Sequence, residues 1–458
     1  MDYLKQWLER LRNRSQRPLH YWEQETLELL TRCDEHSDWL QLSQHSNGFV
    51  REIAVRVLSE RTSPHALLAL AERLNDWVPQ IRKLAEQGVQ PYLQPSQADA
   101  LLFALEPLLA LARKGRSDHS RMLARLAEVL AQAEAQPALE AALPGRQGQA
   151  ARFVFGLLLE NAAVNLLAIL RLGMNHREIS LRGLALAASR RLPLAQARDL
   201  LREGHEAASA SLRVVALREW LARNEEDPQH LQALLRQALL DPAPALRCLA
   251  HWAAPRHGID RNAVLIQRLE RLPSEKRDWL GLLGLAHALG EPGAVPALQV
   301  ALQHCAPSVR VAALETLAVV APEALLPRLL DALDDPAPKV VRCATRLLHK
   351  LPLAADDAQL RSVMAEALLT GKNDKVARLA ALSPLWLNLQ HLLHALSLSD
   401  AEDQQAPLRA ALQLWGQRRR RAYSLQPTSQ QRTTLLTGLA TLTASGKLKA
   451  NEYGHWLD

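Results

Sequence analysis

The chain of 458 residues has few aromatic residues and few cysteines, and each shortage narrows the possible folds. Aromatic residues make up 4% of the sequence, with only four phenylalanines. Stretches typical of β-strands are nearly absent, whereas Leu and Ala are abundant. The four cysteines form no Cys-x-x-Cys pair, which excludes the usual zinc and redox motifs. We therefore expect an almost entirely helical protein without a metal site.

Long hydrophobic runs are also missing. No apolar stretch approaches the ~18 residues that a membrane-spanning helix requires, and the amphipathic N-terminus does not resemble a signal peptide. These features predict a cytoplasmic protein that does not insert into a membrane. In that compartment Cys33, Cys248, Cys305 and Cys343 are interpreted as core thiols, because a reducing environment disfavours disulfides.

Motifs that carry catalysis are not present either. The sequence has no glycine-rich phosphate loop, no GxSxG and no HExxH motif, and His205-Glu206 is its one His-Glu dipeptide. We therefore assign no catalytic residue, no metal ligand and no cofactor.

A repeat runs along most of the chain, and its core is an aliphatic residue, an arginine, two variable residues and a small apolar residue. Successive arginines are 30 to 39 residues apart. The copies clearest in sequence are at Arg51, Arg82, Arg182, Arg213, Arg247, Arg310, Arg342 and Arg378. Copies at Arg121, Arg152, Arg277 and Arg409 follow by extending the register. A period of this length is typical of a solenoid.

Each period has room for two helices and two turns. The second helix carries the arginine, and prolines such as Pro64, Pro228, Pro292 and Pro322 mark the start of the first, where an N–H lacks a helical partner in any case. The small residue three positions after the arginine allows close approach of neighbouring helices. Because a short helix pair cannot bury its own apolar face, the pairs must stack.

The best copies are Asp241 to Ala250, Ala306 to Ala313 and Asp335 to Arg342, with the pattern Asp-Pro-Ala-Pro-x-Val/Leu-Arg. This pattern resembles HEAT repeats, in particular the bacterial phycobilisome-lyase HEAT-like type, over roughly residues 45 to 415. The resemblance implies an all-α, right-handed superhelical solenoid of about twelve two-helix repeats with helical caps. We expect an N-terminal cap at 1–45, with helices near 2–14, 20–32 and 36–44. The solenoid at 46–416 is followed by a basic segment and C-terminal cap at 417–458.

The regularly spaced arginines, here called the ladder arginines, have two interpretations. They could form a cationic stripe that binds phosphates. Alternatively, each could bond an acidic or carbonyl group of its own or a neighbouring repeat, as the resemblance implies. Acidic residues four to seven positions before the arginine favour the structural interpretation, namely Asp76, Glu178, Asp241, Asp335 and Asp374.

Two further groups are candidates for contact with a partner. Arg418, Arg419, Arg420 and Arg421 are the densest positive charge in a chain of net charge +7, although such a run also suits an ordinary helix C-terminus. Trp220, Trp252 and Trp279 lie on ladder helices, where they could anchor a peptide or fill the gap between helix layers.

The sequence favours a non-catalytic scaffold that binds another protein along the concave face lined by the Arg-bearing helices. The alternative is a DNA-binding or alkylpurine DNA glycosylase-like protein, whose partner would be nucleic acid. In that case Trp279 with Asp278, or Trp220 with Glu219, would line a basic face. A continuous basic stripe would favour the alternative, and mixed charge or apolar patches would favour a protein partner.

Overall fold

The computed structural model describes residues 9, 20–34, 37–161, 165–223, 226–351, 358–422 and 424–449. These residues form 27 α-helices with short 3-10 turns, and contain no strand. The chain divides into two compact units, residues 1–231 and 232–458. The division falls inside one helix, whereas the boundaries expected near residues 45 and 416 rest on sequence pattern and stay predictions.

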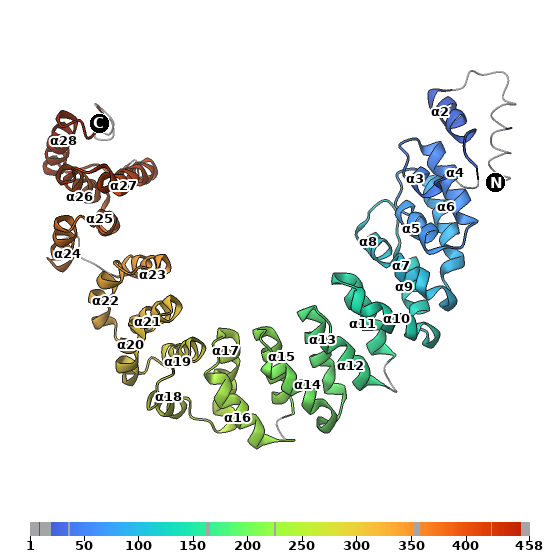
Figure 1. Ribbon diagram of the computed structural model, residues 1–458, viewed down its shortest axis with the longest axis horizontal. Coiled ribbons are helices and arrows are strands. Elements are labelled where there is room, and N and C mark those ends of the chain that lie inside the picture. Colours follow the sequence, from blue (N-terminus) through green and yellow to red (C-terminus); the bar gives the residue numbers. More distant parts are fainter. Residues whose placement is uncertain are drawn as a thin grey trace. The chain divides into compact units, whose positions relative to one another are not determined.

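The first unit is a succession of helices, most of them packed in pairs (Figure 1). The arginines at 51, 82, 182 and 213 each lie on the second helix of a pair. Its helices are α2 (Tyr21–Leu30), α3 (Trp39–Leu42), α4 (Gly48–Ser59), α5 (Pro64–Arg73), α6 (Pro79–Val89), α7 (Ala98–Phe103), α8 (Leu105–Ala110), α9 (Ser120–Leu130), α10 (Gln136–Ala142), α11 (Gly148–Glu160), α12 (Leu166–Met174), α13 (Ile179–Ala188), α14 (Leu194–Glu206) and α15 (Ala210–Leu221), followed by α16 (Pro228–Leu239) at the boundary. The helix expected near residues 2–14 lies outside the described residues.

The second unit continues the same architecture. Its helices are α17 (Pro244–Ala253), α18 (Arg261–Leu269), α19 (Lys276–Leu289), α20 (Val295–Leu302), α21 (Pro307–Val320), α22 (Leu325–Ala332), α23 (Pro338–Leu348), α24 (Ala358–Leu369), α25 (Asn373–Ala380), α26 (Leu385–Leu398), α27 (Glu402–Arg421) and α28 (Ser429–Ala444). The Arg-bearing helices α17, α19, α21 and α23 form one layer and α18, α20 and α22 form the other (Figure 1). The chain is therefore an α-solenoid, as the repeat predicts.

Proline begins many of these helices. Pro64, Pro79, Pro244, Pro307 and Pro338 each occupy the first turn of a helix. The chain enters α20 and α22 through a short 3-10 turn that starts at a proline. Proline fits these positions because its missing N–H would have no helical partner there.

Small residues let the Arg-bearing helices pack closely. Three positions after the arginine, Ala54, Ala85, Ala185, Ala216, Ala250 and Ala313 are fully buried. The copy at Arg121 departs from this pattern, because Ala124 is exposed and α9 instead buries Leu126, Val129 and Leu130. Extending the repeat pattern to Arg121 thus predicts the helix correctly, but the side of the helix that it predicts to be buried is exposed.

The cysteines correct one expectation. All four are free, and Cys343 is buried, but Cys248 and Cys305 are exposed. Their description as core thiols is therefore wrong for those two positions, of which Cys248 lies on α17 and Cys305 in the turn before α21.

Candidate functional site

Five ladder arginines bind the loop that precedes their own helix. In each, one guanidinium nitrogen donates to the carbonyl groups six and five residues earlier. Arg51 donates to His45 and Ser46, both at 2.8 Å. The other four are Arg82, Arg213, Arg247 and Arg310. The bonds fix the turn between the two helices of a repeat and satisfy carbonyl groups that would otherwise lack partners.

Carboxylates join one repeat to the next. Asp76 accepts from Arg51 at 2.9 Å and Asp335 accepts from Arg310 at 2.7 Å, in each case from the arginine 25 residues earlier. Both carboxylates therefore bind the ladder arginine of the preceding repeat, which is one of the two arrangements that the structural interpretation allows. Burial raises the pKa of Asp335, but the hydrogen bond from Arg310, the hydrogen bond from the N–H of Ala337 and the charge of Arg310 together outweigh it, so that the pKa lies below its ordinary value.

Among the eight copies clearest in sequence, the pattern fails at three. Within the described ranges, the side chains of Arg182, Arg342 and Arg378 make no hydrogen bond or ion pair, and Nε of Arg182 is buried without a partner. Arg342 is exposed and Arg378 half-buried. These two belong to successive repeats, so the structural interpretation does not explain them.

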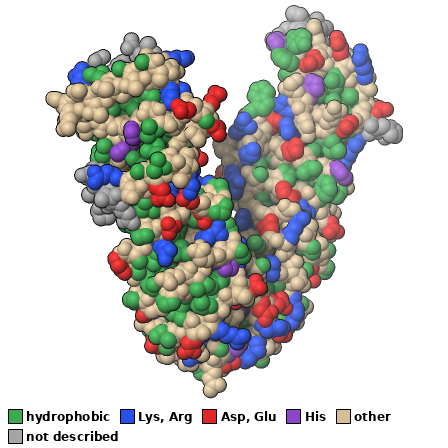
Figure 2. All heavy atoms as spheres, turned by 60° about the vertical axis from the view of Figure 1, so that its left-hand side comes forward, with side chains coloured by type: hydrophobic (Ala, Val, Ile, Leu, Met, Phe, Trp, Pro, Cys, Tyr) green, Lys and Arg blue, Asp and Glu red, His purple; other side chains and the backbone are tan. Residues whose placement is uncertain are grey.

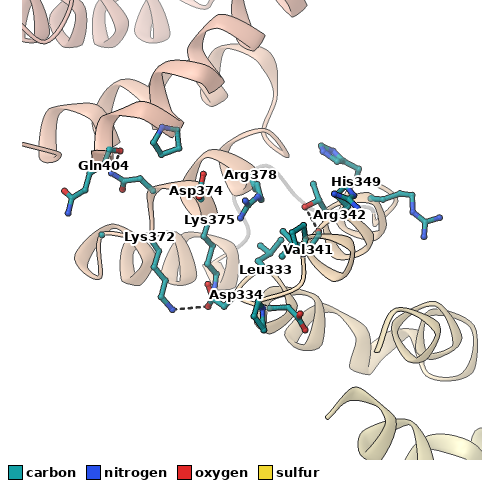
Figure 3. Close-up of a pocket in the computed structure, with 18 of the residues that line it drawn as sticks. Leu333, Asp334, Val341, Arg342, His349, Lys372, Asp374, Lys375, Arg378 and Gln404 are labelled. Atoms are coloured by element: carbon teal, nitrogen blue, oxygen red, sulfur yellow. Dashed lines mark hydrogen bonds and ion pairs between the residues drawn. The ribbon is translucent and has the colours of Figure 1, made fainter. Parts of the chain in front are cut away.

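An open cavity lies where the second unit departs from regular stacking. Helices α17, α19, α21 and α23 pack in succession, as do α25 and α27, but α23 and α25 do not pack along each other in the same way. A cavity of about 1320 Å³ separates them, and Arg342 from α23 and Arg378 from α25 both line it (Figure 3). The unpaired ladder arginines therefore face open space instead of a neighbouring repeat.

Other cations at this cavity are already paired. Asp334 accepts from Lys372 at 3.2 Å and from Lys375 at 2.8 Å (Figure 3). Burial raises the pKa of Asp334, but these hydrogen bonds outweigh it and the pKa falls below its ordinary value. Arg346, from the same cavity, pairs with Glu315. Arg342, Arg378 and Lys350 are thus the cations of this cavity without an ion pair among the described residues, and Asp374 and Asp403 are its carboxylates without one.

A second cavity, of about 590 Å³, shares Thr345, His349, Asp374, Arg378 and Pro407 with the first. We call the two together the C-terminal groove, formed by α23, α25 and α27 with Asn388 of α26. Its apolar part consists of Ala377, Ala381, Ala410, Ala411 and Leu414, the last of which is 60% exposed. A surface of this kind, apolar with a charged margin, suits binding of another molecule.

The basic run ends α27 and contributes unequally to the groove. Arg418 and Arg421 line it, and Arg418 donates to the carbonyl of Ala381 at 3.3 Å. Arg420 is exposed but does not line either cavity. Arg419 is buried over the ring of Trp386, with 5.0 Å between its guanidinium carbon and the ring centre. Its assignment to a partner-binding surface is therefore corrected, because it packs inside the unit.

Burial also corrects two of the three tryptophans. Trp220 and Trp279 are 1% and 2% exposed, so they fill the space between helix layers and cannot contact a partner. Trp252 is 55% exposed, and Arg256 stacks over its ring at 4.2 Å. Only this one of the three remains available as a surface anchor.

Burial also counts against the pairs proposed for the glycosylase-like alternative. Glu219 is buried in an ion pair with Arg190, at 2.7 Å. Asp278 is exposed and lies 3.8 Å from Arg268, but Trp279 beside it is buried. Lys and Arg are interspersed with Asp, Glu and hydrophobic side chains on the face that Figure 2 presents. The structure gives no support to a carboxylate exposed between two tryptophans on a basic stripe.

The described residues contain neither a candidate metal site nor a membrane-spanning helix. No group of three or more His, Cys, Asp or Glu side chains is placed to hold a metal ion within those residues. No helix in the same part of the chain is long and apolar enough to cross a membrane.

Comparisons with known proteins agree with the fold. Residues 262–350, from α18 to α23, match the family model described as HEAT repeats. No curated protein matches the sequence. A solved structure titled "Crystal structure of Kap121p" aligns at 13% identity and a TM-score of 0.30, over 85% of this chain and 48% of that chain. This chain thus spans about half the length of that protein, and a likeness at this score carries no weight for function. Residues 262–350 are therefore HEAT repeats by sequence, and helix pairs of the same kind precede and follow them.

Proposed function

We propose that the protein is a non-catalytic scaffold that binds a partner protein in the C-terminal groove, on the face of the Arg-bearing helices α23, α25 and α27. The observation that carries the proposal is the interruption of the ladder. Five arginines of earlier repeats bind internal groups. Arg342 and Arg378 have no side-chain partner among the described residues, and both line a preformed cavity between α23 and α25.

The chemistry of the groove supports a protein partner. Alanine side chains and the exposed Leu414 provide apolar contact area, and arginines lie at its margin. Protein interfaces commonly combine an apolar centre with a polar rim and favour arginine among charged residues. Rigid helices on either side keep the surface preformed, which reduces the ordering that binding requires.

The proposal retains two finer expectations from the sequence. We place the protein in the cytoplasm, because exposed free thiols at Cys248 and Cys305 suit a reducing compartment. We also retain the bacterial phycobilisome-lyase HEAT-like subtype, on the motif Asp-Pro-Ala-Pro-x-Leu-Arg at residues 241–247. That subtype is proposed for the repeat alone and implies no bilin chemistry.

Site-specific photo-crosslinking in native cells tests the proposal. A photoreactive residue replaces Leu414, which lines the groove, or in a separate variant Leu398, which does not. The two leucines are 60% and 62% exposed, so they are matched in accessibility. The account predicts a protein adduct of defined mass at position 414 that resists nuclease and is missing at position 398.

Equal labelling at both positions would show that the groove has no special role. A nuclease-sensitive adduct at position 414 would instead identify nucleic acid as the bound molecule and reject the protein-binding proposal.

A further inference from the structure

We infer that the C-terminal groove recognises an acidic segment of its partner in extended conformation, through arginine–carboxylate pairs and an amide contact from Asn388. The inference rests on the proposed function and specifies the partner's chemistry. It draws on the charges left uncompensated in the groove, on one buried amide and on the apolar surface between them.

The charge of the groove favours carboxylates. Arg378 lines both cavities, Arg342 lines the first and Arg421 the second, and among the described residues none of the three has an ionic partner. Asp334 and Asp335 of the first cavity are already paired with lysines and with Arg310. Asp374 and Asp403 have no ion pair among the described residues, but they are outnumbered by the unpaired cations Arg342, Lys350, Arg378 and Arg421. Arginine binds carboxylates with two parallel hydrogen bonds when geometry allows, which adds direction to the attraction.

Asn388 supplies a second, independent observation. Its side chain is 3% exposed, lines the second cavity, and has an amide oxygen without a hydrogen-bond partner in the described structure. A buried amide without a partner costs free energy, and an amide has both donors and an acceptor. A peptide backbone offers complementary groups, but a helix uses them internally beyond its first turn. An extended segment leaves them free, so it fits Asn388 better than a helix does.

The rest of the groove favours peptide over nucleic acid. Single-stranded nucleic acids are held by exposed aromatic side chains on which bases stack. Among the described residues, the one aromatic residue that lines either cavity is Trp415, which is 1% exposed and donates its indole N–H to the carbonyl of Leu385 at 2.7 Å. The aliphatic surface of Ala377, Ala411 and Leu414 suits apolar side chains that alternate with acidic ones.

Fluorescence anisotropy on the full chain tests the inference. The probes are a labelled peptide of alternating Glu and Leu with prolines that prevent helix formation, the same peptide with Lys in place of Glu, and a single-stranded oligonucleotide. We expect the acidic peptide to bind at least about tenfold more tightly than either of the others, which corresponds to about 1.4 kcal/mol. Binding should weaken as salt screens the arginine–carboxylate pairs.

Two sets of variants locate the interaction. The double variant Arg378→Glu with Arg421→Glu should lower affinity for the acidic peptide at least about tenfold. The control Arg271→Glu with Lys276→Glu changes net charge equally at exposed positions outside the groove and should leave affinity unchanged. Asn388→Leu should weaken peptide binding yet raise the midpoint of thermal unfolding, because it removes an unsatisfied buried amide. A purely structural role for Asn388 predicts no change in affinity.

Each outcome decides the inference. Tighter binding of the basic peptide or of the oligonucleotide overturns it, as does equal loss in both charge-reversal variants. If no peptide binds although position 414 crosslinks a protein in cells, the partner's chemistry is wrong and the binding function stands. If crosslinking at position 414 also fails, the proposed function itself is rejected.

Discussion

The same residue type at the same repeat position has two roles in this protein, decided by what surrounds it. Arg310 has four hydrogen bonds, two to Asp335 and two to the carbonyls of His304 and Cys305. Arg342, one repeat later, has none among the described residues and faces a cavity. Sequence position alone therefore does not tell a structural arginine from a surface arginine.

Substituting each of these two arginines by methionine should change the free energy of unfolding by different amounts, because only Arg310 has a structural role. Arg310→Met leaves Asp335 partly buried without its cation, and breaking a buried pair costs about 3–5 kcal/mol. Arg342→Met should change the free energy of unfolding by less than about 0.5 kcal/mol. Urea unfolding followed by circular dichroism measures both, and equal losses would contradict the distinction.

Partly buried histidines predict the direction of the pH dependence. Burial lowers the pKa of His391 and His251, with further lowering from His394 and Arg261 respectively. Each unfolded histidine then takes up a proton at a higher pH than the folded one, so stability is lost as pH falls through the unfolded pKa, about 6.5, towards the folded pKa. The urea midpoint should be lower at about pH 5.5 than at about pH 7.5.

The variant His391→Gln checks the source of this effect, because it removes one titrating group. It should narrow the difference between the two midpoints. An unchanged difference would assign the effect to other groups. Asp334 and Asp335 do not contribute in this range, because their lowered pKa values keep them ionised.

Glycines at the contacts between helices set how closely neighbouring helices approach. A Cβ added to Gly281 of α19 would lie 1.9 Å from the backbone carbonyl oxygen of Leu240, which cannot move independently of the chain. A Cβ added to Gly156 of α11 would meet nothing within 4 Å. The two sites are both helical but differ in packing.

Replacing each of these two glycines by alanine should change the stability of the protein in opposite directions. Gly281→Ala must push α19 away from Leu240 and should destabilise the protein by about 1–3 kcal/mol. Gly156→Ala should stabilise it by up to about 1 kcal/mol through helix propensity. The midpoints of thermal unfolding of the two variants test this prediction. If both variants were less stable than the original protein, the open packing at Gly156 would be contradicted.

The elements of this fold were largely predictable, and the groove was not. Helix spacing, proline starts and buried alanines follow from local pattern, and α28 lies within the segment 417–458 where the sequence predicts a helical cap. The burial of Trp220 and Arg419 depends instead on which side of a helix meets the next layer, which a basic or aromatic residue type does not reveal. The groove depends on the interruption of stacking between α23 and α25, although Arg342 and Arg378 both fit the repeat pattern.

On the scale of the whole molecule, stacked repeats should respond locally to damage. Each repeat contacts its neighbours, so stability is close to a sum of local terms. Arg51→Met removes the pair with Asp76 in the first unit. Hydrogen exchange should then accelerate in α4, α5 and α6 and stay unchanged in α19 and α21. Uniform acceleration throughout the chain would show a single cooperative unit instead of two compact ones.

The central claim is that the C-terminal groove is where a partner protein binds. Its most direct test is the dissociation constant of the crosslinked partner, once purified, for the full chain and for two tryptophan variants. Ala411→Trp fills the groove, whereas Ala245→Trp adds the same bulk at an exposed position of α17 outside it. With both variants folded, the account predicts binding weakened at least about tenfold by Ala411→Trp alone. Equal affinity of all three proteins would contradict it.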